Sequence, residues 1–174
     1  MDDPEQLRAS RARLAAALLD GRRRTERALH DGVLQDLTAL TVELQLARGD
    51  AALEDVRRGL HAALDRVRAL ADDVYPSILD ARGLADALRA AARAAGLSAS
   101  VETDGGRAAP DVEAAAFFAC AELFARTDAG AEVTATLRHA DGGLCVELTG
   151  VHGELAQSSR DLVDGLEGAL VVRV

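Results

Sequence analysis

The chain of 174 residues contains no lysine, no asparagine and no tryptophan, and aromatic residues make up only 2% of it. Without lysine the chain cannot form a Walker-type phosphate loop, because that loop uses its lysine to contact the nucleotide phosphates. With so few aromatics, the core must be built from leucine, valine and alanine, and the abundance of alanine and leucine favours helices. No apolar run approaches the roughly 20 residues that a membrane-spanning helix needs, so no membrane association is expected.

Positive charge is also scarce, because 20 arginines face 29 acidic residues and the net charge is −9. This balance argues against nucleic-acid binding, which needs a basic face. The N-terminal sequence MDDPEQLRAS is acidic and has no apolar signal core, so we expect a cytoplasmic protein. Cys120 and Cys145 stand singly in apolar segments and are expected to be reduced core thiols. No His, Cys and Asp residues have the spacing of a zinc site, so no metal is expected.

The first half of the chain has the apolar spacing of two long helices. A stripe at intervals of four, four, three and four residues is formed by Leu29, Val33, Leu37, Leu40 and Leu44. This spacing predicts a helix over residues 4–48, with Gly21 marking a bend or phase shift and Gly49 ending it. A second stripe predicts a helix over residues 51–74, capped by Asp50. A single hairpin cannot bury both stripes, so two copies are expected to pair as a homodimeric four-helix bundle.

After Pro76 the pattern changes to shorter elements that alternate between helix and strand. We predict helices at 81–95, 110–126 and 159–165 and strands at 97–103, 133–137, 144–148 and 169–174. These elements predict helices layered on a mostly antiparallel sheet, which makes the fold class α+β. The domains are predicted as a helical hairpin over residues 1–78 and a second domain over residues 79–174.

His30 carries the most distinctive local chemistry, because it lies at the shoulder of the apolar stripe and is followed by an acid. Asp31 and Gln35 are four residues apart and are expected to share one outward face of the helix. A partly exposed imidazole is a usable nucleophile near neutral pH, and a neighbouring carboxylate can hold its tautomer. Gln35 can orient a water without carrying charge. By spacing alone, however, the pattern favours a surface histidine with a local hydrogen bond.

A basic cluster precedes His30 and is formed by Arg22, Arg23, Arg24 and Arg27. One interpretation is a solvated helix face, which is the usual role of such a run. The other is a docking strip for an acidic partner beside His30. The sequence leaves both interpretations open.

Four ordered motifs over about residues 20–174 resemble those of histidine kinases of the HDxxxQ, nitrate-sensor-like subfamily. ERALHDGVLQDL, which contains His30, resembles the phosphoacceptor box. DVYPSIL and RGLADAL resemble the junction between the dimerisation hairpin and the ATPase-like domain. PDVEAA and the residues after it resemble the helix that carries the first nucleotide box, and RDLVDGLEGALVV resembles the closing motif. The resemblance implies a phosphotransfer hairpin followed by a small histidine-kinase-ATPase-like α/β sandwich.

The resemblance also implies roles for individual residues. His30 would accept the phosphoryl group, Asp31 would be its acid–base neighbour, and Gln35 would position the water that removes phosphate from a response regulator. The implied partner is a response-regulator receiver domain, and a partner histidine kinase is a second possibility.

The nucleotide boxes depart from the family pattern. The metal-holding asparagine of the first box has no counterpart in the segment 122–129, ELFARTDA, because the chain has no asparagine. The adenine-reading aspartate of the second box is absent from residues 148–153, LTGVHG, and only residues 154–159 remain of the lid. ATP-dependent autokinase activity is therefore not expected, and no cofactor is assigned. Two hypotheses follow: a phosphotransferase or response-regulator phosphatase that uses His30, or a non-catalytic pseudokinase that binds a response regulator or a partner kinase.

Overall fold

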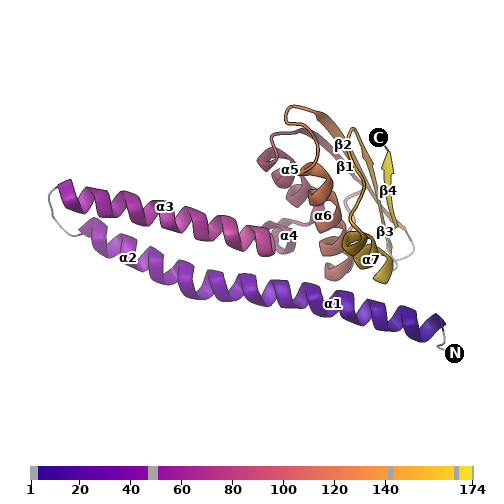
Figure 1. Ribbon diagram of the computed structural model, residues 1–174, viewed down its shortest axis with the longest axis horizontal. Coiled ribbons are helices and arrows are strands. Elements are labelled where there is room, and N and C mark those ends of the chain that lie inside the picture. The colour runs from indigo at the N-terminus through magenta and orange to yellow at the C-terminus, as the bar shows by residue number, and fades with distance from the viewer. Residues whose placement is uncertain (1–3, 47–50, 141–142, 167–168, 174) are drawn as a thin grey trace. The chain divides into compact units, whose positions relative to one another are not determined.

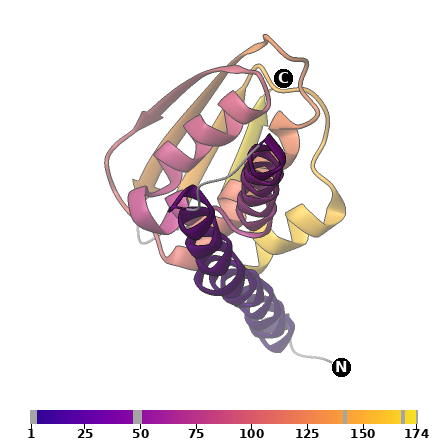
Figure 2. The ribbon, with the colours of Figure 1, turned by 90° about the vertical axis from the view of Figure 1, so that its left-hand side faces the viewer.

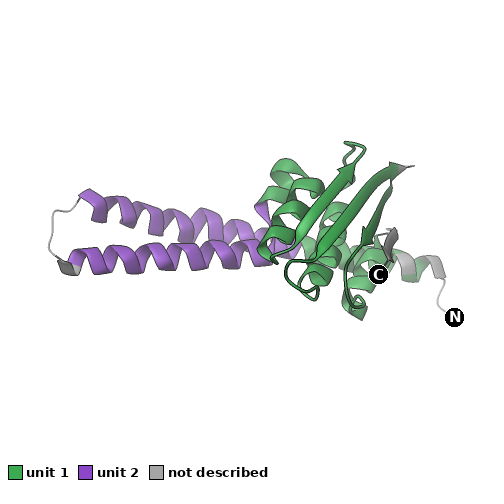
Figure 3. Ribbon diagram, turned by 90° about the horizontal axis from the view of Figure 1, so that it is seen from above, with its two compact units in different colours: residues 1–19, 78–174 green, residues 20–77 purple. Residues whose placement is uncertain are grey.

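The structure is a computed structural model that describes residues 4–46, 51–140, 143–166 and 169–173. Its contacts group the chain into two units, shown in Figure 3: residues 20–77 form one, and residues 1–19 together with 78–174 form the other. Within the described ranges, no helix combines the length and the apolar character needed to span a membrane.

Residues 20–77 form a helical hairpin, whose arms run side by side in Figure 1. Its elements are, in order, the end of α1 (Pro4–Ala28), the π-helix η1 (Leu29–Leu34), α2 (Gln35–Leu46) and α3 (Ala51–Val74). The second arm, α3, packs against η1 and α2. The prediction of two long helices is confirmed, whereas the predicted stop at Gly49 and cap at Asp50 lie outside the described residues.

The first arm is not the continuous α-helix that the sequence predicts. Helix α1 runs through Gly21 without interruption, and the irregular part is η1, eight residues further on. A π-turn bonds residue i to residue i+5, so it changes which side chains face the second arm. Leu34 and Thr41 are buried, while Val33 and Leu40 of the predicted stripe remain 43% exposed. The apolar stripe is therefore wider than the surface that one hairpin can cover.

The second unit is an α+β layer, as predicted. After α4 (Ser77–Arg82) its elements are α5 (Leu84–Ala94), β1 (Ser98–Thr103), α6 (Pro110–Phe124), β2 (Glu132–Ala140), β3 (Gly143–Thr149), α7 (Gln157–Gly165) and β4 (Ala169–Arg173). Helix α5 packs on β1 and α6, and α6 packs on β3, so the two helices cover one face of the sheet (Figure 2). Pro110 opens α6 at the position predicted, where the missing N–H of proline costs no hydrogen bond.

The sheet corrects the prediction of a mostly antiparallel arrangement. Its order is β1-β2-β3-β4, with β1 parallel to β2, β2 antiparallel to β3, and β3 parallel to β4. Helix α6 connects β1 to β2 and α7 connects β3 to β4, and a helical crossover returns the chain in the same direction. Only β2 and β3 form the predicted hairpin, in which Ala140 lies opposite Gly143.

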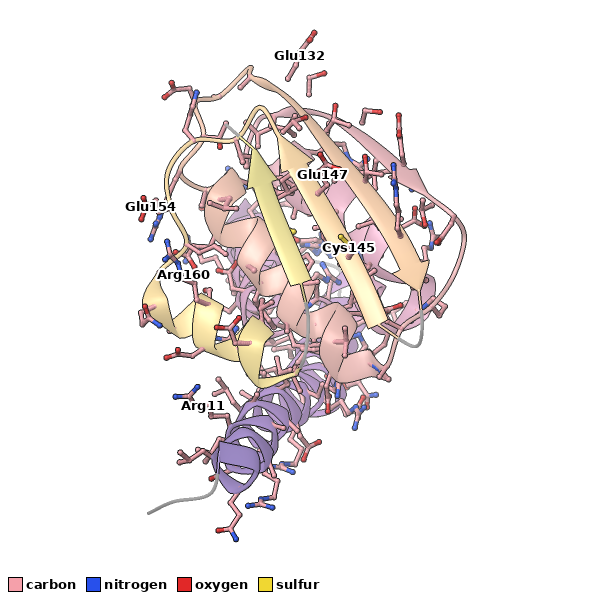
Figure 4. All side chains as sticks on the ribbon, turned by 90° about the vertical axis from the view of Figure 1, so that its right-hand side faces the viewer. Arg11, Glu132, Cys145, Glu147, Glu154 and Arg160 are labelled. Atoms are coloured by element: carbon pink, nitrogen blue, oxygen red, sulfur yellow. The ribbon has the colours of Figure 1, made fainter. Side chains whose placement is uncertain are left out.

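The core of this unit lies between the helices and the inward face of the sheet. The alternating residues predicted for β2 and β3 are all buried: Val133, Ala135, Leu137, Leu144, Val146 and Leu148. Cys120 of α6 is fully buried with them, as predicted, and its burial raises the pKa of the thiol to about 12. Cys145 was also predicted to be a core residue, but it is only half-buried. It alternates along β3 with the buried Leu144 and Val146 and lies near Glu147 (Figure 4).

The helix predicted from residue 81 is divided in two by Gly83. Gly83 has a φ of +87°, a conformation that L side chains rarely adopt. A Cβ at this position would lie 3.2 Å from Nε of Arg107. That guanidinium forms an ion pair at 2.8 Å with Glu113, whose side chain is buried. The positive φ therefore favours glycine here and interrupts the helix between α4 and α5, and the close approach of Arg107 leaves little room for a side chain.

His139 belongs to β2 and ties this strand to the loop after β1. Its backbone N–H donates to Asp104 Oδ2 at 2.6 Å, and its Nδ1 lies 2.5 Å from Oδ1 of the same carboxylate. Backbone N–H groups of His139 and Gly106 and the His139 ring hold the pKa of Asp104 at about 2. The end of β1 is thus tied to the end of β2.

Candidate functional site

His30 lies within η1, and its side chain is 60% exposed. Its Nδ1 is 3.7 Å from Oδ1 of Asp31, which is within ion-pair range but too long for a hydrogen bond. A carboxylate on the Nδ1 side favours the tautomer that carries its proton there. This arrangement leaves Nε2 with the lone pair that a nucleophile needs.

Gln35 is the first residue of α2 and follows His30 by five positions. Because the π-turn bonds residue i to residue i+5, two residues five positions apart are one turn apart and lie on the same side of the helix. His30 and Gln35 accordingly line the same groove. The sequence predicted a shared face for Asp31 and Gln35, but the lining of this groove includes Gln35 without Asp31, which is 73% exposed.

The groove lies between the two arms of the hairpin and has a volume of about 490 Å³. Its lining residues come from the end of α1, η1, α2, α3 and the start of α4: Glu26, His30, Leu34, Gln35, Thr38, Arg68, Ala71, Asp72 and Ser77. This volume is in the range of small-ligand sites. The chain thus places its imidazole in an open recess that several polar and charged residues line.

Two carboxyl groups of the groove are perturbed. Burial raises the pKa of Glu26, and a positive charge on His30, when its imidazole is protonated, acts against that rise. Burial also raises the pKa of Asp72, and the negative charge of Asp73 raises it further. His30 lowers the pKa of both acids, against the effect of burial, although neither acid is adjacent to it in sequence.

Arg68 is the arginine among the lining residues. Its NH1 lies 3.2 Å from Oδ1 of Asp65, three residues earlier on α3, and both side chains are more than half exposed. An exposed pair of this kind is worth roughly 0.2–1 kcal/mol. The guanidinium is therefore held only weakly by its neighbour.

The four arginines of the basic cluster before His30 have different surroundings. Arg23 donates from Nε to the hydroxyl of Tyr75 at 2.9 Å and is partly buried. Arg24 pairs instead with Asp20 at the surface. Burial lowers the pKa of Arg22, and Arg27 is exposed. One of the four arginines therefore serves the packing of the hairpin.

The segment that resembles the first nucleotide box is engaged in contacts of its own. Oε1 of Glu122 accepts from the backbone N–H of Ala156 at 2.8 Å, and its other oxygen accepts from the Ser159 hydroxyl. Arg126 lies 2.7 Å from the same carboxylate and also donates to the carbonyl of Glu154. Burial opposes ionisation of Glu122, but these hydrogen bonds and the Arg126 charge outweigh it and hold its pKa below the ordinary value.

Metal-ion binding has no support in the part of the chain that the structure describes. No group of three or more His, Cys, Asp or Glu residues there is placed to hold an ion. His61 is exposed on α3, and His152 lies 3.9 Å from the exposed Asp128.

Several groove residues were missed by the sequence analysis. Glu26 is one helical turn before His30, and Arg68 and Asp72 are four apart on α3, so helical spacing alone could have grouped each set. Asp72 is largely exposed, yet it lines the groove. What the sequence lacked was the register of one arm against the other.

Comparison with known families agrees with this picture of the hairpin. Residues 21–94 match a family model described as histidine kinase. The matched range contains His30, Asp31, Gln35 and the whole groove lining. This match supports a histidine kinase family and hence a histidine kinase-like protein of two-component signalling. A comparison with curated proteins found no match.

Proposed function

We propose that this protein acts in two-component signalling as a histidine phosphotransferase or response-regulator phosphatase, using His30 and having no ATP site of its own. The observation that carries the proposal is the placement of an exposed His30 and Gln35 in one groove, with the Asp31 carboxylate on the Nδ1 side of the imidazole. The partner is the phosphorylated receiver domain of a response regulator.

In phosphotransfer, the lone pair of Nε2 attacks the phosphorus of the receiver's aspartyl phosphate. The P–N bond forms as the P–O bond breaks, and the receiver carboxylate leaves with the electron pair. The ring becomes cationic during attack, and Asp31 stabilises that charge and can take the Nδ1 proton. The reaction is reversible, so phosphate can pass in either direction.

In dephosphorylation, water replaces the imidazole as the nucleophile. The side-chain amide of Gln35 holds that water in line with the scissile P–O bond, and the products are the receiver carboxylate and inorganic phosphate. Gln35 suits this role because it can accept a hydrogen bond from water without adding charge near the phosphate.

The proposal of a lost ATP site rests on the residues that would have to bind the nucleotide. Asparagine is missing from the whole chain, so the metal ligand of the first box has no source. The Glu122 carboxylate accepts hydrogen bonds from Ala156 and Ser159 and pairs with Arg126. These contacts hold residues 154–159 in place. These residues do not fit Mg-ATP, so no step of the proposed reactions uses it.

The proposal of a homodimer rests on the uncovered surface of the hairpin. Its large apolar side chains that remain 43–78% exposed are Val33, Leu40, Val42, Leu46, Val56 and Leu70. Covering them with a second copy would bury both stripes in a four-helix bundle, and each fully buried leucine is worth about 1.5–3 kcal/mol.

The test is incubation of the full chain with receiver domains carrying labelled phosphate. The wild-type protein should gain acid-labile label, lower the receiver's label, or do both. His30→Ala should gain no label, and Gln35→Ala should gain label yet dephosphorylate the receiver more slowly, because only hydrolysis needs a placed water. His61→Ala is the matched control, since His61 is an exposed histidine of the same hairpin.

If wild type and His30→Ala act alike on every phosphorylated receiver, His30 has no chemical role. The protein would then be a non-catalytic pseudokinase that binds a response regulator or a partner kinase. Binding without any change in label would support that alternative directly.

A further inference from the structure

We propose that Arg68 binds the phosphoryl group at His30 and positions it for transfer, an inference that rests on the function proposed above. His30 belongs to the first arm and Arg68 to the second, so the site is assembled only when the hairpin is closed. Nothing in the spacing of the sequence connects the two residues, because they are 38 positions apart. Their shared groove connects them.

The charges of the groove create the need for such a residue. Glu26 and Asp72 line it together with His30, and both are acids. A phosphoryl group carries up to two negative charges, so carboxylates alone would repel it from the imidazole. Arg68 is the one lining residue with a permanent positive charge, and the guanidinium fork matches the oxygens of a phosphoryl group.

The neutral donors of the groove are less suited to this role. The Thr38 hydroxyl donates to the carbonyl of Leu34 at 2.7 Å and is therefore committed to the helix backbone. Gln35 is neutral and is already assigned to water. Arg68 is engaged only in the exposed pair with Asp65, and an exposed pair can be exchanged for a phosphate at little cost.

In this arrangement the guanidinium donates to two equatorial oxygens of the phosphoryl group while Nε2 of His30 attacks phosphorus. Arg68 neutralises charge that is present in the donor, the transition state and the phosphohistidine. It therefore lowers the concentration of donor needed and raises the rate of transfer at low donor concentration.

The experiment uses phosphoramidate, a small phosphodonor that needs neither a receiver nor ATP. Nε2 attacks its phosphorus, the P–N bond of the donor breaks, and ammonia leaves with the electron pair and takes up the imidazole proton. The initial rate of phosphohistidine formation on the full chain is followed by phosphorus NMR over a range of donor concentrations. Arg68→Ala should lower the rate at low donor by about 10- to 100-fold, the effect of losing a charge-assisted contact, and raise the half-saturating concentration.

Three further variants separate binding of phosphate from a role in helix structure. Arg68→Lys keeps the charge but loses the fork, and should react at a rate between those of Arg68→Ala and wild type. Arg66→Ala removes an exposed arginine from another face of α3 and should react like wild type. Asp65→Ala breaks the same ion pair from the other side and should react at the wild-type rate or faster, because it releases Arg68 for the phosphate.

The outcomes are distinct. Equal rates for wild type and Arg68→Ala would overturn the role of Arg68 while the function at His30 stands. A loss in Asp65→Ala equal to that in Arg68→Ala would also overturn it, since the ion pair would then be what matters. Labelling of His30→Ala would remove the proposed role of His30 and this inference with it. A wild type that gains no label from phosphoramidate or from phosphorylated receivers would overturn this inference, and if it also leaves the receivers' label unchanged, the proposed function is removed as well.

Discussion

Arg23 and Tyr75 join the two ends of the hairpin, although 52 residues separate them. Nε of Arg23 donates to the Tyr75 hydroxyl at 2.9 Å, and the guanidinium carbon lies 5.0 Å from the centre of the ring. Tyr75 is only 1% exposed. A buried phenol needs a hydrogen-bond partner and an aromatic face attracts a cation, so one arginine satisfies both requirements.

Tyr75→Phe should therefore destabilise the protein by about 1 kcal/mol, because it removes the hydrogen bond but keeps the ring. Tyr75→Ala should cost about 3–5 kcal/mol, because it also leaves a cavity. Arg24→Ala is the control, since its pair with Asp20 is exposed and worth under about 1 kcal/mol. Urea unfolding measures all three. If Tyr75→Phe were as stable as wild type, the hydrogen bond would contribute nothing.

Glu26 should make stability depend on pH. Its pKa in the folded chain is raised above the ordinary value of 4.5, so its contribution to stability is fully present below pH 4.5 and is lost as the pH rises through the raised pKa. Glu26→Gln cannot ionise and should have a higher urea midpoint than wild type at pH 7, with the difference vanishing near pH 4.

Glu43→Gln removes an exposed glutamate of α2 and serves as the matched control for the loss of one carboxylate. A lower midpoint for Glu26→Gln at pH 7 would contradict the prediction, because it would mean that the ionised carboxylate stabilises the fold.

Leu40→Glu and Leu70→Glu should convert the proposed homodimer to a folded monomer. These side chains are 43% and 59% exposed in a single chain, so a charge there costs little in the monomer but would be buried between two copies. Ala62→Glu adds the same charge at an exposed position of α3 outside the apolar stripe and should stay dimeric. Light scattering at micromolar concentration distinguishes the states, and a monomeric wild type would disprove the homodimer.

Calorimetry with millimolar Mg-ATP should give no saturable heat. The chain offers no asparagine for the metal, and the Glu122 carboxylate is held by the backbone N–H of Ala156 and the Ser159 hydroxyl. Saturable binding would contradict the proposed loss of the ATP site and would favour ATP-dependent autophosphorylation instead.

Glu122→Gln tests the same contacts through stability. It should destabilise the protein by about 1.5–3 kcal/mol, the usual effect of losing charge-assisted hydrogen bonds. Glu132→Gln, at an exposed position of β2, should change stability by less than about 0.5 kcal/mol. Equal effects of the two substitutions would show that Glu122 does not anchor residues 154–159.

Two glycines should respond in opposite ways to alanine. Gly59 lies inside α3 with no atom within 4 Å of the position of a Cβ, so Gly59→Ala should stabilise the hairpin by about 0.8–1 kcal/mol. Gly150 has a φ of +76°, and its Cβ would collide with the carbonyl of Glu132. Gly150→Ala should therefore destabilise the protein by at least about 1–2 kcal/mol. Thermal unfolding of both variants tests the pair, and a stabilised Gly150→Ala would contradict the backbone geometry of the loop after β3.

The sequence predicted much of the fold because the signals involved are local. Apolar spacing defined both arms of the hairpin, Pro110 marked the start of α6, and alternation identified Leu144, Val146 and Leu148 as the buried face of β3. Strand direction was predicted wrongly, because alternation gives a strand the same pattern in parallel and antiparallel pairs. The direction depends on where α6 and α7 return the chain, which is a property of their packing.

For the candidate site, the sequence by itself determined the chemistry that is available: one histidine followed by an acid, a glutamine five residues on, and no lysine or asparagine in the chain. Only the tertiary structure decided which of these groups meet. The π-turn brings Gln35 rather than Asp31 into the groove with His30, and the register of α3 adds Arg68 and Asp72. The physical reason is that contacts along one helix follow from fixed backbone spacing, whereas contacts across two helices depend on how their side chains pack.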